Sequence, residues 1–306
     1  MSENEFIKKL REATGKNMGD GLLLSGGVDS AAIAYLARVR SFTVSLEDHG
    51  KDREYAELVA KHLQIPLHCI SMSVEEAIGA IPEVIRILKT FDPAIPNDLA
   101  VYFALTKAKE QGCKTVMTGD GGDELFAGYG YMLDLDLKEY IQSIAGNLHF
   151  SSSTLGEALD IEMKQPFLDK EFIEFALGID PEEKVKERNG KRWGKWILRK
   201  SFEGLLPESI VWREKSPLEE GSGMSRIRNV LEQRISQAEF EEKEEEYGIR
   251  LRGREHLYYY EVYRRVVGRI PEPKKDEGAC IYCGAGIPMH SEHCRICGGM
   301  QHNDSY

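Results

Sequence analysis

The chain contains 306 residues, 42% of them apolar, and carries a formal net charge of −11 at pH 7. This length and apolar content suit one large domain or two modest ones, each able to bury a core. The acidic balance argues against a broad nucleic-acid surface, because a phosphate backbone would be repelled, and leaves room only for a local basic patch. No apolar run approaches the roughly 20 residues of a membrane span. The N-terminus, MSENEFIKKLREATGK, also lacks a signal-peptide core, so a cytoplasmic protein without membrane contact is expected.

Strands alternate with helices through the first part of the chain. The apolar pattern predicts helices at 5–14, 31–37, 52–63, 74–88 and 97–112, and strands at 22–24, 41–47, 66–72 and 113–119. This alternation predicts an α/β fold with a doubly wound parallel sheet. Ligands of such sheets bind at the carboxyl ends of the strands, so the loops after 22–24 and 113–119 are the expected places for a site.

The remainder is predicted to be mainly helical, with helices packed against one flank of the sheet at 138–148, 169–177, 191–203, 225–240 and 254–267. The charge run EFEEKEEEYG at 239–248 is typical of a solvated helix face and suggests no function. The segment IPEPKKDEG at 270–278 combines proline, charge and glycine, which indicates a linker. The expected organisation is an α/β core at 1–130, a helical part at 131–270, a linker at 271–278 and a small terminal piece at 279–306.

The hexapeptide SGGVDS lies directly between the first predicted strand and its helix. Backbone N–H groups at a helix N-terminus attract an anion. Gly26 and Gly27 let the backbone approach that anion closely, and Ser25 and Ser30 add hydroxyl donors. Asp29 fits beside phosphates if Mg²⁺ lies between them. The loop is neither the lysine-bearing P-loop nor a dinucleotide fingerprint, and an ordinary strand-to-helix turn is the alternative.

A second polar segment, TGDGGDELFAGYGYM at 118–132, follows the fourth predicted strand. It therefore reaches the same edge of the sheet as SGGVDS. Asp120, Asp123 and Glu124 interrupt its glycines, which suits a cation bound to phosphate oxygens. An Asx-rich turn without a ligand is the alternative.

Several segments resemble known families. S-G-G-x-D-S resembles the pyrophosphate loop of N-type ATP pyrophosphatases, an adenine nucleotide alpha hydrolase-like fold shared by amide-forming ligases, argininosuccinate-type ligases and tRNA thiolation enzymes. The segment at 118–132 resembles the S-G-E-G-x-D-E-L-F-x-G-Y stretch of asparagine synthetases and their β-lactam synthetase relatives, with Asp120 where glutamate is usual. The segments at 162–177 and 190–225 resemble further synthetase motifs in the same order, with Lys164 in place of arginine.

The resemblance implies roles for particular residues. Lys195 would stabilise charge on the adenylate and pyrophosphate, Asp29 and Asp123 would hold Mg²⁺, and Asp120 or Glu124 would accept a proton. ATP would be bound by the loop, by backbone groups near the adenine and by residues of the two later segments, namely Ser25, Gly26, Gly27, Val28, Asp29, Ser30, Val44, Leu46, Gly119 and Lys215.

The implied reaction is adenylation of a carboxylate, aspartate by default, followed by attack of ammonia or another amine with release of AMP. Asparagine synthetases typically begin with a glutaminase domain whose N-terminal cysteine is the nucleophile. This chain begins Met1-Ser2, so ammonia is expected to arrive free or from a separate glutaminase. A carrier protein is a further partner that the sequence leaves open.

The last part of the chain contains two C-x-x-C pairs separated by ten residues, formed by Cys280, Cys283, Cys294 and Cys297. Two such knuckles complete a tetrahedral, structural Zn²⁺ site, here a zinc ribbon. A disulfide or free thiols are the alternatives, and His290 or His293 could replace a ligand. The ribbon could dock a protein, a carrier or RNA, or only fasten the C-terminus. Cys69 and Cys113 stand alone, which suits a reducing compartment.

Two other functions compete with the amide ligase. A tRNA-modifying, thiolation-type ATP pyrophosphatase would combine the loop with a zinc ribbon. The acidic balance, the lack of a C-x-x-C pair near the loop and the match at 118–130 count against it. A non-catalytic nucleotide-binding or carrier-docking module is the other alternative, and intact Asp29, Asp123 and Lys195 argue against such decay.

Overall fold

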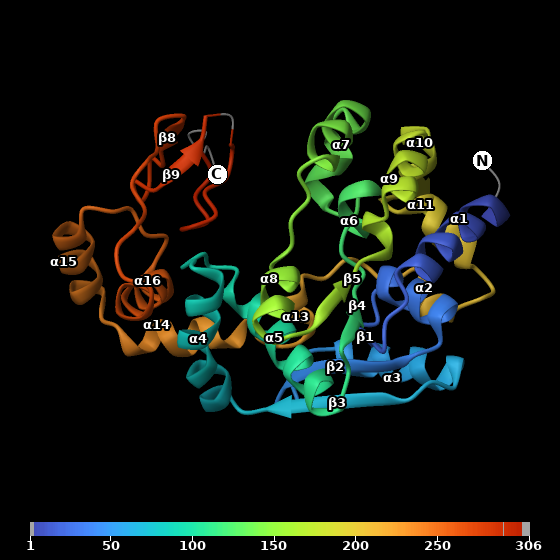
Figure 1. Ribbon diagram of the computed structural model, residues 1–306, viewed down its shortest axis with the longest axis horizontal. Helices are drawn as coiled ribbons and strands as arrows, with labels where there is room; N and C mark the ends of the chain where they lie inside the picture. Colours follow the sequence, from blue (N-terminus) through green and yellow to red (C-terminus); the bar gives the residue numbers. More distant parts are fainter. Residues whose placement is uncertain (1–2, 290, 302–306) are drawn as a thin grey trace.

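A computed structural model describes residues 3–289 and 291–301 of the chain. At its centre is a five-stranded sheet in the order β3-β2-β1-β4-β5, with every neighbouring pair parallel (Figure 1). Its strands are β1 (Gly21–Leu23), β2 (Arg40–Leu46), β3 (Leu67–Met72), β4 (Thr115–Met117) and β5 (Glu162–Lys164). The strand order reverses at β1, which confirms the prediction of a doubly wound sheet.

The strand β5 is absent from the sequence-based prediction. It is three residues long, lies at the edge of the sheet and pairs with β4 alone. Two of its residues are charged, and Glu162 is exposed. A short edge strand of this kind has no apolar run, so its sequence carries no strand signal.

Two hydrophobic clusters cover the two faces of the sheet. One gathers α1 (Glu3–Lys16), α2 (Val28–Ala37), α3 (Asp52–Leu63), α9 (Lys170–Leu177) and α11 (Trp196–Phe202) around Leu22. The other gathers α4 (Val74–Leu88), α5 (Ile95–Glu110) and α8 (Ser151–Ala158) around Phe42 and Val44. Strand side chains alternate between faces, so the sheet is buried on both sides, as a parallel sheet requires.

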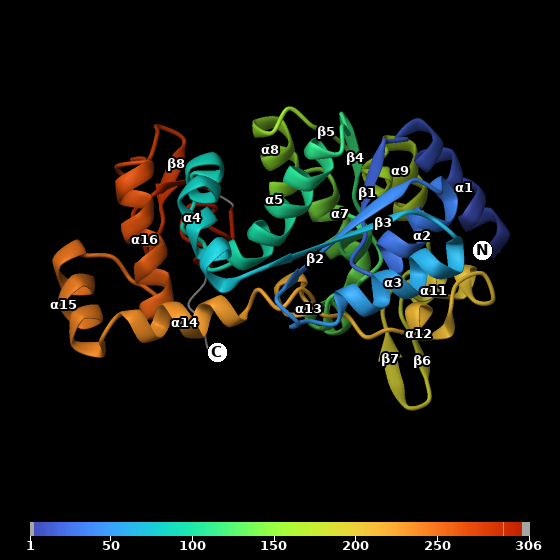
Figure 2. The ribbon, with the colours of Figure 1, turned by 90° about the horizontal axis from the view of Figure 1, so that it is seen from below.

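The helices beyond residue 131 do not share one flank, contrary to the prediction. The helices at 137–145, 170–177 and 196–202 join the cluster around Leu22. In contrast, α8, α14 (Arg226–Arg234) and α16 (Arg254–Val266) join the cluster on the other face, with α4. In Figures 1 and 2 the helices α14, α15 (Gln237–Tyr247) and α16 lie at the opposite end of the molecule from α1. The segment between α11 and α14 contains the short helices α12 (Glu208–Val211) and α13 (Leu218–Gly221). The remaining short helices are α6 (Gly122–Leu125), α7 (Leu137–Ala145), α10 (Pro181–Lys184) and the 3₁₀ turns Gly130–Asp134 and Pro166–Leu168.

The helix predicted at 191–203 is wrong in its first part. Residues 191–193 form β7 (Lys191–Trp193), which pairs antiparallel with β6 (Lys186–Arg188) in a hairpin that projects from the body (Figure 2). Gly190, with φ of 75°, adopts the left-handed conformation that the tight turn needs. The helix α11 begins only at Trp196.

The helix predicted at 225–240 is two helices. Ser236 is extended and its hydroxyl accepts the N–H of Glu239 at 3.1 Å, which begins the new helix α15 (Gln237–Tyr247). No residue of α15 is buried, which confirms that the charge run lies on a solvated helix. Within the described residues no helix is both long and apolar enough to cross a membrane.

Phe126 links the folded core to the site described below. Its ring is fully buried and contacts the ring of Phe6 edge-on, with centroids 5.4 Å apart, and its carbonyl accepts the N–H of Lys195 at 2.7 Å. We expect F126A to lower the free energy of unfolding by about 3–5 kcal/mol, because a large cavity would open. Urea unfolding measures this change. F240A, on the solvated α15, should cost much less, and equal losses would contradict the prediction.

Candidate active site

The loop after β1 forms an open anion cradle. Gly26 has φ of 72°, and a side chain there would overlap the backbone of Tyr55, so only glycine fits. Gly27 is the N-cap of α2 and no side chain caps the helix, which leaves its first N–H groups available to a ligand. The hydroxyl of Ser25 accepts the N–H of Gly27 at 3.3 Å and lies 3.4 Å from the hydroxyl of Ser30.

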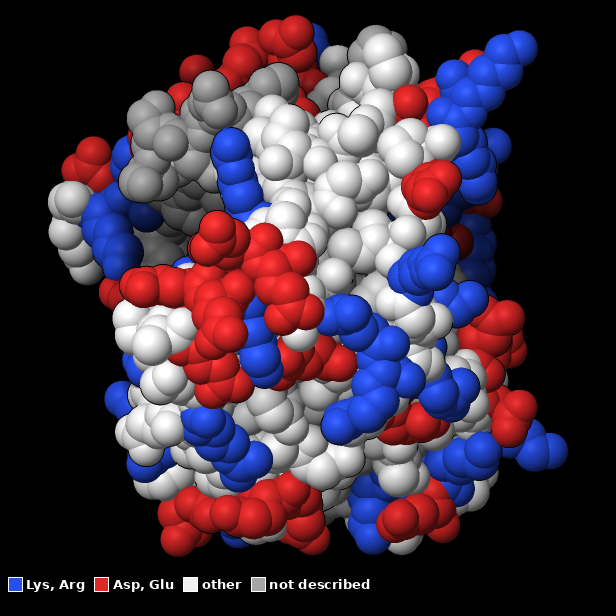
Figure 3. Space-filling model, turned by 90° about the vertical axis from the view of Figure 1, so that its left-hand side faces the viewer, with Lys and Arg blue, Asp and Glu red and all other residues white. Residues whose placement is uncertain are grey.

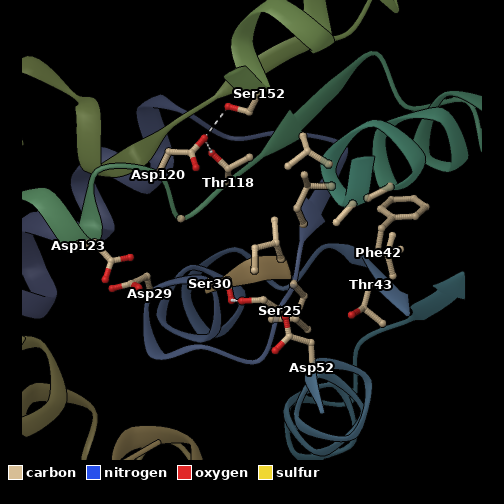
Figure 4. Close-up of a pocket in the computed structure, with 18 of the residues that line it drawn as sticks. Ser25, Asp29, Ser30, Phe42, Thr43, Asp52, Thr118, Asp120, Asp123 and Ser152 are labelled. Atoms are coloured by element: carbon tan, nitrogen blue, oxygen red, sulfur yellow. Dashed lines mark hydrogen bonds between the residues drawn. The ribbon is translucent and has the colours of Figure 1, made fainter. Parts of the chain in front are cut away.

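Lys195 lies between two carboxylates. Its Nζ is 2.5 Å from Oδ2 of Asp29 and 2.7 Å from Oδ1 of Asp123, and its side chain is 3% exposed. Lys215 pairs with the other oxygen of Asp123 at 2.8 Å. Figure 4 shows the carboxylates of Asp29 and Asp123 side by side, each pointing toward the other. Residues that follow β1, β4 and β7 thus meet at one point.

Close backbone packing brings Lys195 into this position. Lys195 has φ of 57°, a left-handed conformation that is uncommon for lysine, immediately before α11. A side chain at Gly128 would overlap Asp123 and Lys195, and a side chain at Gly194 would overlap the carbonyl of Ala127. The two glycines therefore permit the approach of two segments that are far apart in sequence.

The charges of this cluster stabilise one another. Burial by itself would raise the pKa of the Asp123 carboxyl, but the ammonium groups of Lys195 and Lys215 outweigh it and lower the pKa to about 2. Burial likewise disfavours the ammonium of Lys195, but Asp123 and Asp29 raise its pKa overall. Both groups are therefore charged at neutral pH.

The carboxylates also fit a magnesium site. Oδ1 of Asp29 and Oδ1 of Asp123 are buried and have no hydrogen-bond partner in the described part of the chain. The latter oxygen has only its ion pair with Lys195. Oδ1 of Asp29 thus has no donor, and a carboxylate oxygen of this kind beside an anion cradle is a ligand that Mg²⁺ shares with phosphates.

Asp120 is held firmly at one side of the site. Its Oδ2 accepts three hydrogen bonds, from Thr118 at 2.7 Å, Ser152 at 2.6 Å and Gln165 at 3.0 Å (Figure 4). Glu124 is held differently, because its Oε1 accepts the hydroxyl of Tyr129 at 2.9 Å. Burial, followed by the charge of Asp123, raises the pKa of Glu124.

Two cavities meet at Asp120. The first, of about 190 Å³, is lined by Ser25, Asp29, Val44, Gly119 and Asp123 among others, and a hollow of about 80 Å³ continues it beside Val28 and Lys195. The second, of about 670 Å³, shares Asp120, Ser152 and Lys215 with the first. Val44 thus lines the first cavity, and its contact with adenine stays a prediction. The N–H of Leu46 instead donates to the carbonyl of Ser222 at 2.8 Å.

Two arginines of the site were not predicted. Arg213 donates to the carbonyl of Ser25 at 2.8 Å and pairs with Asp52 at 2.5 Å. Burial raises the pKa of Asp52 despite this partner. Arg199 is buried and donates to the carbonyls of Gly194, Arg213 and Val211. Both lie in the segment at 190–225 that resembles synthetase motifs, and this resemblance was the available signal. They fix the loops that carry Lys195 and Lys215.

The four cysteines of the C-terminal part form a second candidate site. Their sulfur atoms all lie within 4.8 Å of one another, with Cys280 and Cys297 3.7 Å apart and Cys283 and Cys294 3.8 Å apart. All are buried and none forms a disulfide, so this set fits a tetrahedral metal. The hairpin of β8 (Glu277–Ala279) and β9 (Gly286–Pro288) frames the cluster, and β8 begins inside the expected linker. His293 pairs with Asp92 at 3.4 Å, and His290 lies outside the described residues.

Removing the central ammonium should destabilise the protein. K195M leaves Asp29 and Asp123 buried without their shared partner, which costs about 3–5 kcal/mol at pH 7. Because the folded pKa of Asp123 lies below its ordinary value of about 3.9, this stabilisation is present above about pH 4 and is lost as the pH falls toward 2. The difference in the free energy of unfolding between wild type and K195M, measured with urea, should therefore become smaller as the pH falls. K107M is the control, because Lys107 is half-exposed and pairs with the exposed Glu110, and a gap independent of pH would contradict the account.

Metal binding by the cysteine cluster can be measured directly. Wild-type protein purified with zinc should hold about one equivalent, and C283S should lose it and unfold more easily, because the cysteines pack among α4 and α16. C69S is the matched control, since Cys69 is exposed and lies outside the cluster. Equal metal content in the two variants, by elemental analysis, would rule the site out.

The sequence and structure can now be compared with known proteins. The model of the asparagine synthase family matches residues 10–149 and 141–275. A probable glutamine-hydrolysing asparagine synthetase of Dictyostelium discoideum is 32% identical over 290 residues, covering 79% of this chain and 52% of the relative. Asparagine synthetase B of Escherichia coli is 32% identical over 274 residues, covering 78% and 49%.

The chain thus spans about half the length of the curated relatives it matches. Among solved structures, the U34-tRNA thiolase NcsA from Methanococcus maripaludis has a TM-score of 0.36 at 14% identity, covering 93% of this chain and 85% of the thiolase. The NMN synthetase from Francisella tularensis has a TM-score of 0.33 at 14% identity, covering 90% and 99%. These structural likenesses are weak, whereas the sequence match extends over both cavities and the lysine cluster. The chain belongs to the asparagine synthase family.

Proposed function

We propose that the chain is an ATP-dependent amide ligase that releases AMP and pyrophosphate. The observation that carries this proposal is the Lys195 ammonium between Asp29 and Asp123 at the N-terminus of α2. An anion cradle, two cations and a pair of carboxylates suit a reaction in which a triphosphate is cleaved between its inner phosphates. The family relatives, which are named asparagine synthetases, support the same class.

In this proposal the triphosphate lies along the loop after β1. The first N–H groups of α2 and the hydroxyls of Ser25 and Ser30 bind pyrophosphate oxygens. Lys195 and Lys215 neutralise charge on the leaving pyrophosphate. Asp29 and Asp123 would hold Mg²⁺, which would supply further charge neutralisation when bound. The adenine rests near Val44 in the 190 Å³ cavity.

The acid and the amine enter from the larger cavity. Asp120 borders both cavities, so a carboxylate in the larger one can reach the α-phosphorus beside it. The acid oxygen attacks that phosphorus and pyrophosphate leaves, which gives an acyl-adenylate. An amine then attacks the acyl carbon and AMP leaves. Asp120 is the better-placed candidate for taking the amine proton, because it lines both cavities and Glu124 lines neither.

Ammonia, free or supplied by a separate glutaminase, is the simplest amine. The relatives are named as glutamine-hydrolysing, and the matched region spans about half of them. A carrier protein that bears the acid or the amine is compatible with the same chemistry.

The tRNA-modifying alternative is less favoured by surface charge. Figure 3 views the end of the molecule that carries α15 and shows acidic side chains gathered over that helix. The exposed residues of α15 include Glu241, Glu242, Glu245 and Glu246. This acidic face lies at the same end of the molecule as the cysteine lobe, residues 277–300, and a phosphate backbone approaching it would be repelled.

The proposal is tested by exchange of labelled pyrophosphate into ATP, screened over carboxylic acids with aspartate first. We expect exchange that depends on an acid, and a fall of roughly 10²–10³-fold in D123N. D160N is the matched control, because the Asp160 side chain is 88% exposed and pairs only with Lys109 among the described residues. Exchange that requires tRNA would favour the thiolation-type enzyme. No exchange with any acid would favour the non-catalytic module.

A further inference from the structure

The larger cavity has a wall chemistry that restricts which acid can fill it. Its volume of about 670 Å³ lies within the range of roughly 300–1,000 Å³ that is typical of sites for drug-sized ligands. The cavity is therefore far larger than an aspartate molecule. Its walls come from the first turns of α5 and α8, the segment after α6, the strand β7 and the segment at 214–218.

Asp98 is a buried carboxyl in this wall. It is 7% exposed and lies in the first turn of α5. Within the described residues it forms no salt bridge. Burial raises its pKa to about 7, the charges of Asp92 and Glu219 add to this rise, and the Ser151 hydroxyl opposes it. Ser152 donates to Asp120, so consecutive serines at the start of α8 lie beside two of the carboxyl groups that line the cavity. A buried carboxylate without a cation is stabilised when a ligand supplies one.

The cations of the same wall are already engaged. Lys191 pairs with Glu214 and Arg192 pairs with Asp134 at 3.0 Å. Lys215 belongs to Asp123, and the Arg199 guanidinium donates to backbone carbonyls. Each Lys and Arg among the described lining residues thus already has a partner, so a second carboxylate, which aspartate would bring, would have to displace one of these partners.

Aromatic rings form another part of the wall. Tyr129 and Tyr131 stack with centroids 5.7 Å apart and an interplanar angle of 11°, and Phe150 and Trp193 also line the cavity. Tyr131 is 57% exposed, so its ring is accessible to a ligand. Such surfaces bind flat or apolar groups.

We propose, on the basis of the proposed ligase function, that the acid activated here is an amine-bearing monocarboxylic acid larger than aspartate. Its ammonium group pairs with Asp98, its body lies against Tyr129 and Tyr131, and its carboxylate reaches the junction of the cavities at Asp120. Asp98 is in this assignment a residue that determines substrate specificity.

The test uses calorimetric titration of the full chain in the presence of Mg²⁺ and a non-hydrolysable α,β-methylene analogue of ATP. The probes are Nα-benzoyl-lysine, its Nε-acetylated twin and aspartate. We expect the free amine to bind at least tenfold more tightly than its acetylated twin and than aspartate. D98N should reduce the preference for the free amine to less than threefold, and D160N should leave it unchanged.

A second variant covers the possibility that D98N does not fold. Y131A changes an exposed ring, and it should weaken both benzoyl probes by roughly 2–10-fold without changing their ratio. The inference is overturned if neither benzoyl probe binds, if the acetylated twin binds equally well, or if D98N keeps the preference. Pyrophosphate exchange distinguishes the two proposals. Pyrophosphate exchange with aspartate as the only active acid would support the ligase proposal and refute the proposed substrate class. Tight binding of the free amine without exchange on any acid would refute the ligase proposal.

Discussion

The ion cluster around Lys195 is the interaction on which the site depends. Two carboxylates and two ammonium groups meet in a place where a lone charge would be strongly destabilised. Their charges cancel, so the cluster can remain buried before any ligand arrives. Lys195 and Asp29 are 166 residues apart in the chain, and only the folded arrangement brings them together. Cations that are already aligned need little reorganisation when charge develops on a leaving pyrophosphate.

This cluster imposes constraints on the backbone around it. Lys195 and Ala127 both adopt left-handed conformations, which cost of order 1–3 kcal/mol each. The hydrogen bond from Lys195 to Phe126 and the lack of side chains at Gly128 and Gly194 hold these conformations in place. The aromatic core around Phe126 therefore helps to position the Lys195 ammonium, although the rings do not contact it. Arg199 and Arg213 act in the same way through carbonyl groups.

The sequence predicted those parts of the fold in which a local pattern and a tertiary role coincide. The run of leucines, the SGGVDS loop and the apolar α2 form one continuous signal, and the structure contains them as predicted. The strand β5 and the hairpin of β6 and β7 were missed, because short polar strands have no apolar periodicity. The cluster of Lys195, Asp29 and Asp123 was grouped only through resemblance to a family, since no spacing rule connects such distant residues. Asp98 was overlooked because an acidic residue in the first turn of a helix is ordinarily a solvated one.

The cysteine lobe is joined to the larger cavity by a short chain of contacts. The carbonyl of Ile296, between the last two cysteines, accepts the hydroxyl of Thr90 at 3.0 Å and the N–H of Phe91 at 2.8 Å. The next residue, Asp92, pairs with His293 and accepts the N–H of Ala94 at 2.9 Å, where α5 begins.

The first turn of α5 then continues the connection into the cavity. Asn97 accepts the N–H of Glu219 at 2.8 Å, and Asp98 faces the larger cavity. A metal held by the four cysteines would therefore brace the segment that positions Asp98. Because hydrogen bonds and an ion pair connect the last knuckle, the turn before α5 and Glu219, the small C-terminal lobe supports the site in which the acid is expected to bind.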